Sequence, residues 1–139
     1  MFALDPAFFT TSAPLTRLAL CDARLQLDAR FAWLVLIPRV AGAREIEDLP
    51  EPARFLLMAE IVLAGRAARA IGEAAGRPVE KLNIGALGNI TAHLHVHVTG
   101  RRADDPAWPG PVWGFGRPTA YSPNALAVAT AAALAVLEA

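Results

Sequence analysis

The pattern of hydrophobic and polar positions predicts two β-strands in the first third of the chain. Residues 1–14 are rich in aromatic residues and proline, and we expect Thr10–Pro14 to form a loop that leads into the fold. Leu15–Asp22 alternates loosely between apolar and polar residues, which predicts a first strand. The short segment Leu25–Asp28 either continues this strand or starts a hairpin as a further one. A turn is expected at Ala29–Arg30. The apolar run Phe31–Ile37, which a proline ends, predicts a central strand buried on both faces.

A helical period follows between residues 51 and 75 and predicts one long helix, with Pro52 in its first turn and Gly76 as its stop. Glu60 falls in the middle of the predicted apolar side. We interpret it as a partly buried carboxylate satisfied by a neighbouring arginine rather than as a catalytic group. The residues that we expect on the apolar side are Leu56, Leu63, Ala67, Ile71 and Ala74.

The second half of the chain predicts two more strands, an irregular segment and a helix. Together with the first half, these elements predict a single α+β domain over residues 1–139, in which one long helix crosses an antiparallel sheet of about five strands. The expected elements are a strand at 80–84, a turn at 85–89, a strand at Thr91–Thr99, a proline-rich irregular segment at 101–118 and a helix from the N-cap Ser122 to about Glu138.

Composition narrows the class of protein. The 13 basic and 13 acidic residues cancel, so bulk charge favours neither nucleic acid nor an anionic membrane as a partner. No apolar stretch reaches the roughly 18 residues that a membrane span needs, and the N-terminus lacks the basic region of a signal peptide. The single cysteine, Cys21, cannot form an internal disulfide and is expected to be buried. We therefore expect a cytoplasmic protein.

All three histidines of the chain, His93, His95 and His97, occupy alternate positions. On a strand, whose side chains alternate with a period of two, they point to one face. On a helix they could not share a face, because residues two apart lie about 200° apart around the axis. This spacing predicts a site built on one face of the strand.

Two kinds of chemistry suit three imidazoles on one face. Neutral imidazoles at alternate positions can ligate one metal ion, with Asp22, Asp28 or Glu80 as a further ligand, although the spacing selects none of the three. A neutral imidazole is also a good nitrogen nucleophile near pH 7, and flanking histidines can donate to phosphate oxygens. The residues by themselves leave both interpretations open.

The segment His93–Thr99 resembles the signature of the histidine triad (HIT) superfamily, in which three histidines alternate with apolar residues. The resemblance extends to Asn83, to Gly88–Asn89 just before the triad, and to Leu34–Arg39, an apolar strand that closes in proline and a basic residue. Residues 104–114 are similar to a bacterial HIT-like subgroup of the diadenosine tetraphosphate hydrolase type. We therefore expect a HIT-like fold.

The resemblance implies a homodimeric nucleotide hydrolase or nucleotidyl transferase that acts on the α-phosphate of a dinucleoside polyphosphate or a nucleoside phosphoramidate. His95 would be the nucleophile and would form a transient nucleotidyl-histidine. His97 would bind the non-bridging oxygens, and His93 would assist them or the leaving group. The nucleophile would need no cofactor, although the scheme leaves room for a divalent metal bound with the substrate. The residues implied in substrate binding are Asn83, Asn89, Thr91 and Asp28.

One position departs from the family pattern. Ile90 stands where members commonly carry a serine or threonine, and Thr91, which has the same parity as the histidines, is the expected replacement for that hydroxyl. A non-catalytic nucleotide-binding or sensing protein is therefore the alternative function. We interpret Trp108 and Trp113 as packing or dimer-contact residues in preference to residues that stack on a base.

Overall fold

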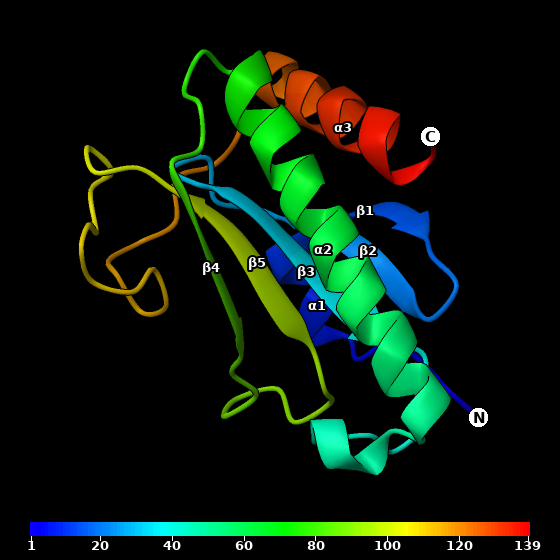
Figure 1. Ribbon diagram of the computed structural model, residues 1–139. Helices are drawn as coiled ribbons and strands as arrows, with labels where there is room; N and C mark the ends of the chain where they lie inside the picture. The colour runs from blue at the N-terminus through cyan, green and yellow to red at the C-terminus, as the bar shows by residue number, and fades with distance from the viewer.

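A five-stranded antiparallel sheet lies at the centre of the computed structural model, which describes residues 1–139 (Figure 1). The strand order β1-β2-β3-β5-β4 places β5 between β3 and the edge strand β4. This confirms the predicted α+β class and the predicted sheet. The strands are β1 (Ser12–Arg17), β2 (Cys21–Gln26), β3 (Ala32–Pro38), β4 (Lys81–Ala86) and β5 (Val96–Arg101).

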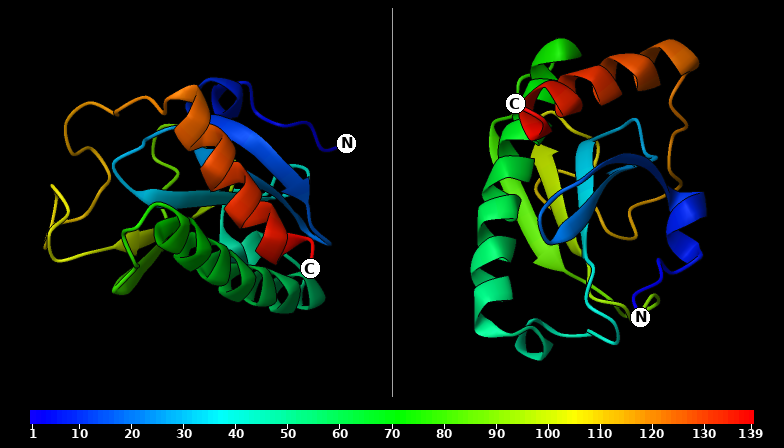
Figure 2. Two further views of the ribbon diagram at one scale, coloured as in Figure 1. Left: turned by 90° about the horizontal axis from the view of Figure 1, so that it is seen from above. Right: turned by 90° about the vertical axis from the view of Figure 1, so that its right-hand side faces the viewer.

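Helices cover the two faces of this sheet unequally. The long helix α2 (Glu51–Ala74) crosses one face and packs against α3 (Pro123–Leu137). The short helix α1 (Ala7–Thr11) lies on the opposite face (Figure 2). A single 3-10 turn, η1 (Ile46–Asp48), precedes α2. None of the helices has both the length and the hydropathy needed to cross a membrane.

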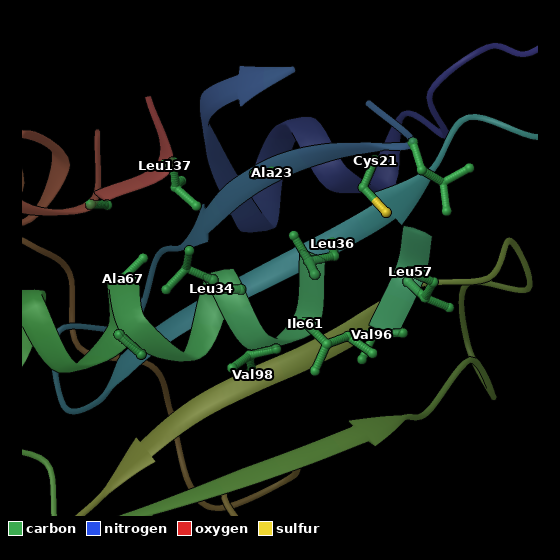
Figure 3. Close-up of a cluster of buried hydrophobic side chains, with 14 of the residues drawn as sticks. Cys21, Ala23, Leu34, Leu36, Leu57, Ile61, Ala67, Val96, Val98 and Leu137 are labelled. Atoms are coloured by element: carbon green, nitrogen blue, oxygen red, sulfur yellow. The ribbon is translucent and has the colours of Figure 1, made fainter. Parts of the chain in front are cut away.

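The period of two along each strand separates the core into two clusters. On β5, Val96 and Val98 face α2, whereas His97 and Thr99 face the other side of the sheet. The larger cluster fills the space between α2, α3 and the sheet (Figure 3). The smaller one, around Trp33, lies on the histidine side. The labelled residues of the larger cluster are Cys21, Ala23, Leu34, Leu36, Leu57, Ile61, Ala67, Val96, Val98 and Leu137.

The predicted first strand, Leu15–Asp22, is wrong in its bounds because the chain turns in the middle of it. The strand β1 ends at Arg17, and β2 begins at Cys21. Glu60, which is only 6% exposed, reaches up from α2 and accepts hydrogen bonds from the backbone N–H groups of Leu20 at 2.8 Å and Cys21 at 2.9 Å. Glu60 is thus a structural carboxylate, as expected, but its partners are backbone groups of the turn rather than an arginine.

The loop expected at Thr10–Pro14 is also wrong, because these residues end α1 and begin β1. Arg24 of β2 holds this segment: its guanidinium donates to the hydroxyl of Ser12 at 2.7 Å and to the carbonyl of Ser12 at 2.9 Å. Phe8 of α1 is buried against the sheet. The partners that order the segment are distant in sequence, so local pattern did not reveal them.

The buried side of α2 matches the predicted one only in part. Ala67 and Ile71 are buried, as expected, and Leu63 is half-buried. Leu56 and Ala74, which were also expected on this side, are exposed, and Leu57 and Ile61 are buried instead. A second apolar stripe lies on the solvent side of the helix. It consists of Phe55, Met58 and Val62, which are 70%, 62% and 50% exposed. The C-terminal helix is confirmed, with the hydroxyl of its N-cap Ser122 accepting from the backbone of Ala125.

Candidate functional site

The predicted strand Thr91–Thr99 begins later than expected. Strand β5 begins at Val96, which pairs with Ala86 of β4, so only His97 of the three histidines lies on β5. The residues just before the strand are bonded elsewhere: the backbone N–H of Leu94 donates to the carbonyl of Ala43 at 2.9 Å. This contact ties the triad segment to the loop that precedes η1.

His95 lies at the centre of the site, with its ring 5.0 Å from those of Phe8 and His97. Its Nδ1 is 2.7 Å from the backbone carbonyl oxygen of His93. A carbonyl oxygen can only accept, so Nδ1 carries the proton and Nε2 of the neutral ring holds a lone pair. Burial lowers the pKa of His95, which favours this neutral form near pH 7.

His97 has the complementary tautomer. The indole Nε1–H of Trp33, on the neighbouring strand β3, donates to Nδ1 of His97 at 2.9 Å. Indole is a donor only, so the proton of neutral His97 is on Nε2. Burial, and then the neighbouring His95, lower the pKa of His97 to about 4. His97 is therefore a neutral hydrogen-bond donor beside a neutral nucleophilic nitrogen.

The ring of His93 is held by two neighbouring residues. Its Nε2 is 2.9 Å from the carbonyl oxygen of Pro38, at the end of β3, so this nitrogen is the donor. Phe2 packs edge-on against the ring, with the two ring centroids 5.3 Å apart. These contacts fix the backbone of His93, whose carbonyl in turn orients His95.

A polar cavity of about 130 Å³ opens beside the His95 ring. Gly88 forms one wall, and it must be small, because a Cβ there would lie 3.0 Å from the carbonyl oxygen of Thr91 and 3.8 Å from Cε1 of His95. The cavity is available space next to the His95 ring. Its lining residues are Arg44, Glu45, Ala86, Gly88, Asn89, Leu94 and His95.

The residues just before the triad differ in their position relative to the cavity. Asn89 lines the cavity. Thr91 is half-buried next to Gly88 and is not part of the cavity lining. Ile90 is fully exposed and contributes nothing to the site.

Asn83 and Asp28 are not brought to the cavity. The side-chain oxygen of Asn83 accepts from the guanidinium of Arg101 at 2.7 Å. Asp28 is 2% exposed, forms a 2.8 Å ion pair with Arg30, and accepts from the backbone of Thr119. Although burial raises it, the hydrogen bonds from Arg30 hold the pKa of Asp28 below its ordinary value. The side chains of Asn83 and Asp28 are thus both hydrogen-bonded to other groups of the chain.

The irregular segment after β5 covers the histidine side of the sheet. The ring of Trp113 lies 5.7 Å from that of His97, and its Cη2 atom would be 3.2 Å from a Cβ on Gly85. Its Nε1 is buried without a hydrogen-bond partner. Trp108 is 40% exposed, and the guanidinium of Arg101 lies 5.6 Å from the centroid of its ring. Both tryptophans pack, as expected, but Trp113 packs on a triad histidine.

Sequence reasoning missed three residues of the site: Phe8, Trp33 and Arg44. The register pairs Trp33 with Thr99, so its indole is a diagonal neighbour of His97, and a correct strand pairing would have indicated it. Phe8 and Arg44 come from segments that the triad does not neighbour in sequence, and no local signal marks them.

The metal interpretation lacks a ligand set. No three His, Cys, Asp or Glu side chains gather where they could hold a metal ion. Of the carboxylates considered as further ligands, Asp22 pairs with Arg39 at 3.1 Å and Glu80 accepts from the backbone of Ala103.

Known protein families and solved structures include relatives of this chain. The family model of the HIT domain matches residues 11–104. A solved histidine triad (HIT) protein from Sinorhizobium meliloti 1021 is 40% identical, with 98% of this chain and 97% of that chain covered and a TM-score of 0.87. A histidine triad protein from Bradyrhizobium japonicum is 36% identical, with 98% of both chains covered and a TM-score of 0.88. One from Marinobacter aquaeolei VT8 is 36% identical, with 99% and 97% covered and a TM-score of 0.89. None of the curated proteins matches the chain.

Proposed function

Since the chain belongs to the HIT domain family, whose proteins are generally nucleotide hydrolases or transferases, we propose that it is a cytoplasmic nucleotide phosphohydrolase or nucleotidyl transferase. Its substrate is a dinucleoside polyphosphate or a nucleoside phosphoramidate, attacked at the α-phosphate. The observation that carries the proposal is the tautomer of His95, which leaves a lone pair on Nε2 of a ring that borders a polar cavity.

The reaction runs in two displacements. In the first, Nε2 of His95 forms a bond to the α-phosphorus, and the bond from phosphorus to the leaving oxygen or nitrogen breaks, its electron pair departing with the leaving group. In the second, water attacks the phosphorus of the nucleotidyl-histidine and loses a proton to solvent, the phosphorus–nitrogen bond breaks, and its electron pair returns to Nε2. The proton stays on Nδ1 throughout, hydrogen-bonded to the carbonyl oxygen of His93, and this acceptor stabilises the positive charge that develops on the ring.

The neighbouring groups stabilise the transition state in distinct ways. The Nε2–H group of His97 donates a hydrogen bond to a non-bridging oxygen, and Asn89 adds a second donor from the cavity wall. His93 is a positioning residue that orients His95 through its carbonyl. Asn83 and Asp28, implied by the resemblance in substrate binding, would have to give up Arg101 and Arg30 to meet a substrate.

The test is to incubate the purified protein with diadenosine tetraphosphate and with adenosine 5′-phosphoramidate and to measure the release of nucleotide. We expect turnover of at least one substrate and a loss of about 10³-fold or more in His95→Ala, because the nucleophile is gone. Trapping of a ³²P-labelled adenylyl group on the wild-type protein but not on His95→Ala identifies the intermediate. Full activity in His95→Ala would refute the assigned nucleophile.

A homodimer is part of the proposal. The solvent-facing stripe of α2, formed by Phe55, Met58 and Val62, is apolar and exposed, and β4 is an edge strand of the sheet. Burial of such a stripe against a second copy would remove it from water, which favours association.

The alternative function is nucleotide binding or sensing without turnover. Ile90, at the position where family members commonly carry a hydroxyl, is fully exposed and offers no donor to a leaving group. Nucleotide binding in the micromolar range or tighter, with no product after prolonged incubation, would favour this alternative.

A further inference from the structure

The polar cavity beside His95 has one cationic side chain in its lining, Arg44. We infer that Arg44 binds the phosphate groups of a polyphosphate leaving group, and therefore that the substrate class of this site is the dinucleoside or nucleoside polyphosphate rather than the phosphoramidate. This inference rests on the proposed function, since it assigns the leaving-group half of the same reaction.

Arg44 is held in place by its backbone. The residue before it, Ala43, is 1% exposed and accepts a hydrogen bond from Leu94, the neighbour of His95. The carboxylate of Asp48 accepts from the backbone N–H groups of Arg44 and Glu45, both at 2.9 Å. The loop before η1 and the triad segment accordingly lie at the same end of the sheet (Figure 1). Arg44 therefore comes from a segment fixed relative to His95.

The guanidinium of Arg44 has no bonded partner within the chain, although its charge acts on the nearby carboxylate of Asp48. It makes no hydrogen bond and no ion pair, whereas Arg30, Arg39 and Arg101 near the sheet are each paired with an aspartate. The side chain of Glu45, the one acid in the cavity lining, already accepts from the backbone of Asp48 in a capping box. An exposed guanidinium beside a polar cavity is suited to bidentate binding of phosphate oxygens.

The two substrate classes place different demands on the site. A polyphosphate departs as an anion, with the electron pair of the broken phosphorus–oxygen bond on its terminal oxygen, and a guanidinium beside it stabilises that charge without a proton transfer. A phosphoramidate departs as an amine, which needs a proton and gains nothing from a cation. Burial lowers the pKa values of His95 and His97, so the cation that the lining of the cavity offers is Arg44.

The experiment compares Arg44→Gln and Arg44→Lys with the wild-type protein on two substrates that share the adenylyl group, diadenosine tetraphosphate and adenosine 5′-phosphoramidate. We expect the ratio of kcat/KM for the polyphosphate to that for the phosphoramidate to fall about 10- to 100-fold in Arg44→Gln, as for the loss of a hydrogen-bonded charge pair. Arg44→Lys should recover part of the ratio. Arg117→Gln, which removes another exposed arginine away from the cavity, should keep the wild-type ratio.

A binding measurement separates this inference from the proposed function. Calorimetric titration with inorganic pyrophosphate should show binding to the wild-type protein that weakens about 10-fold or more in Arg44→Gln, whether or not either substrate is hydrolysed. No pyrophosphate binding to the wild type, or an unchanged substrate ratio in Arg44→Gln, overturns the inference while leaving His95 chemistry intact. Absence of hydrolysis of both substrates, with pyrophosphate binding that depends on Arg44, overturns the proposed reaction and keeps the anion site.

Discussion

The indole Nε1–H of Trp33 donates to Nδ1 of His97 at 2.9 Å, and this hydrogen bond determines which nitrogen of the histidine carries the proton. Protonation of Nδ1 would set two N–H groups against each other, so the contact opposes the imidazolium form. We predict that Trp33→Phe raises the pKa of His97 from about 4 toward the ordinary value of 6.5. An NMR pH titration of the histidine ring resonances measures this.

Phe31→Leu is the matched control for that substitution. Phe31 belongs to the same apolar cluster and packs edge-on against Trp33, but it makes no hydrogen bond to His97. An equal rise of the His97 pKa in both variants would show that burial alone, and not the indole donor, keeps the ring neutral.

The low pKa of His97 also makes the free energy of unfolding depend on pH. An unfolded histidine titrates near 6.5 and folded His97 near 4, so between these values the unfolded chain binds a proton that the folded chain does not. Stability therefore falls as the pH drops through this window, by at most about 1.4 kcal/mol per pH unit from this group. Urea denaturation at pH 7 and pH 5 should show a smaller loss in His97→Asn than in the wild-type protein; equal losses would contradict the assignment.

Glu60 stabilises the turn between β1 and β2 from the middle of α2. Glu60→Gln keeps one acceptor oxygen but turns an NH₂ group toward the second backbone N–H, so we predict a loss of about 1–3 kcal/mol in the free energy of unfolding. Chemical denaturation measures the loss. Glu73→Gln, an exposed change on the same helix, should stay within about 0.5 kcal/mol of the wild type, and an equally small effect for Glu60→Gln would argue against its role.

Gly85 provides the surface on which Trp113 rests beside His97. A methyl group in Gly85→Ala would lie 3.2 Å from Cη2 of the indole, so we predict that the ring shifts and that stability falls by about 1 kcal/mol. Tryptophan fluorescence and thermal unfolding report the change. The smaller ring of Trp113→Phe has no atom at that position, so Gly85→Ala should cost less in that background. Additive effects in the double variant would mean that the two residues do not interact.

The apolar stripe on α2 tests the proposed homodimer. Met58→Glu places a charge at the centre of Phe55, Met58 and Val62, so we predict that it converts the dimer to a monomer. Light scattering coupled to size-exclusion chromatography measures the mass. Arg17→Glu, at a side chain that is 77% exposed on the other edge of the sheet, should leave the mass unchanged. A wild-type protein that is monomeric at micromolar concentration would contradict the proposal.

The sequence by itself determined the elements with strong local signals. The apolar run that became β3, the long period of α2 and the N-cap Ser122 of α3 each lie within one stretch of chain, where side-chain periodicity and capping chemistry are sufficient. Alternation also identified the three histidines, and their resemblance to the HIT signature indicated the family that the domain match confirms.

Only the tertiary structure decided how those histidines are used, because the groups that fix their protons come from elsewhere in the chain. Trp33 is 64 positions away from His97, and Pro38 is 55 positions away from His93. The same holds for Arg44, which reaches the cavity through a backbone hydrogen bond between distant segments. Periodicity places side chains on a face, whereas tautomers, pKa values and a cavity depend on the neighbours that folding supplies.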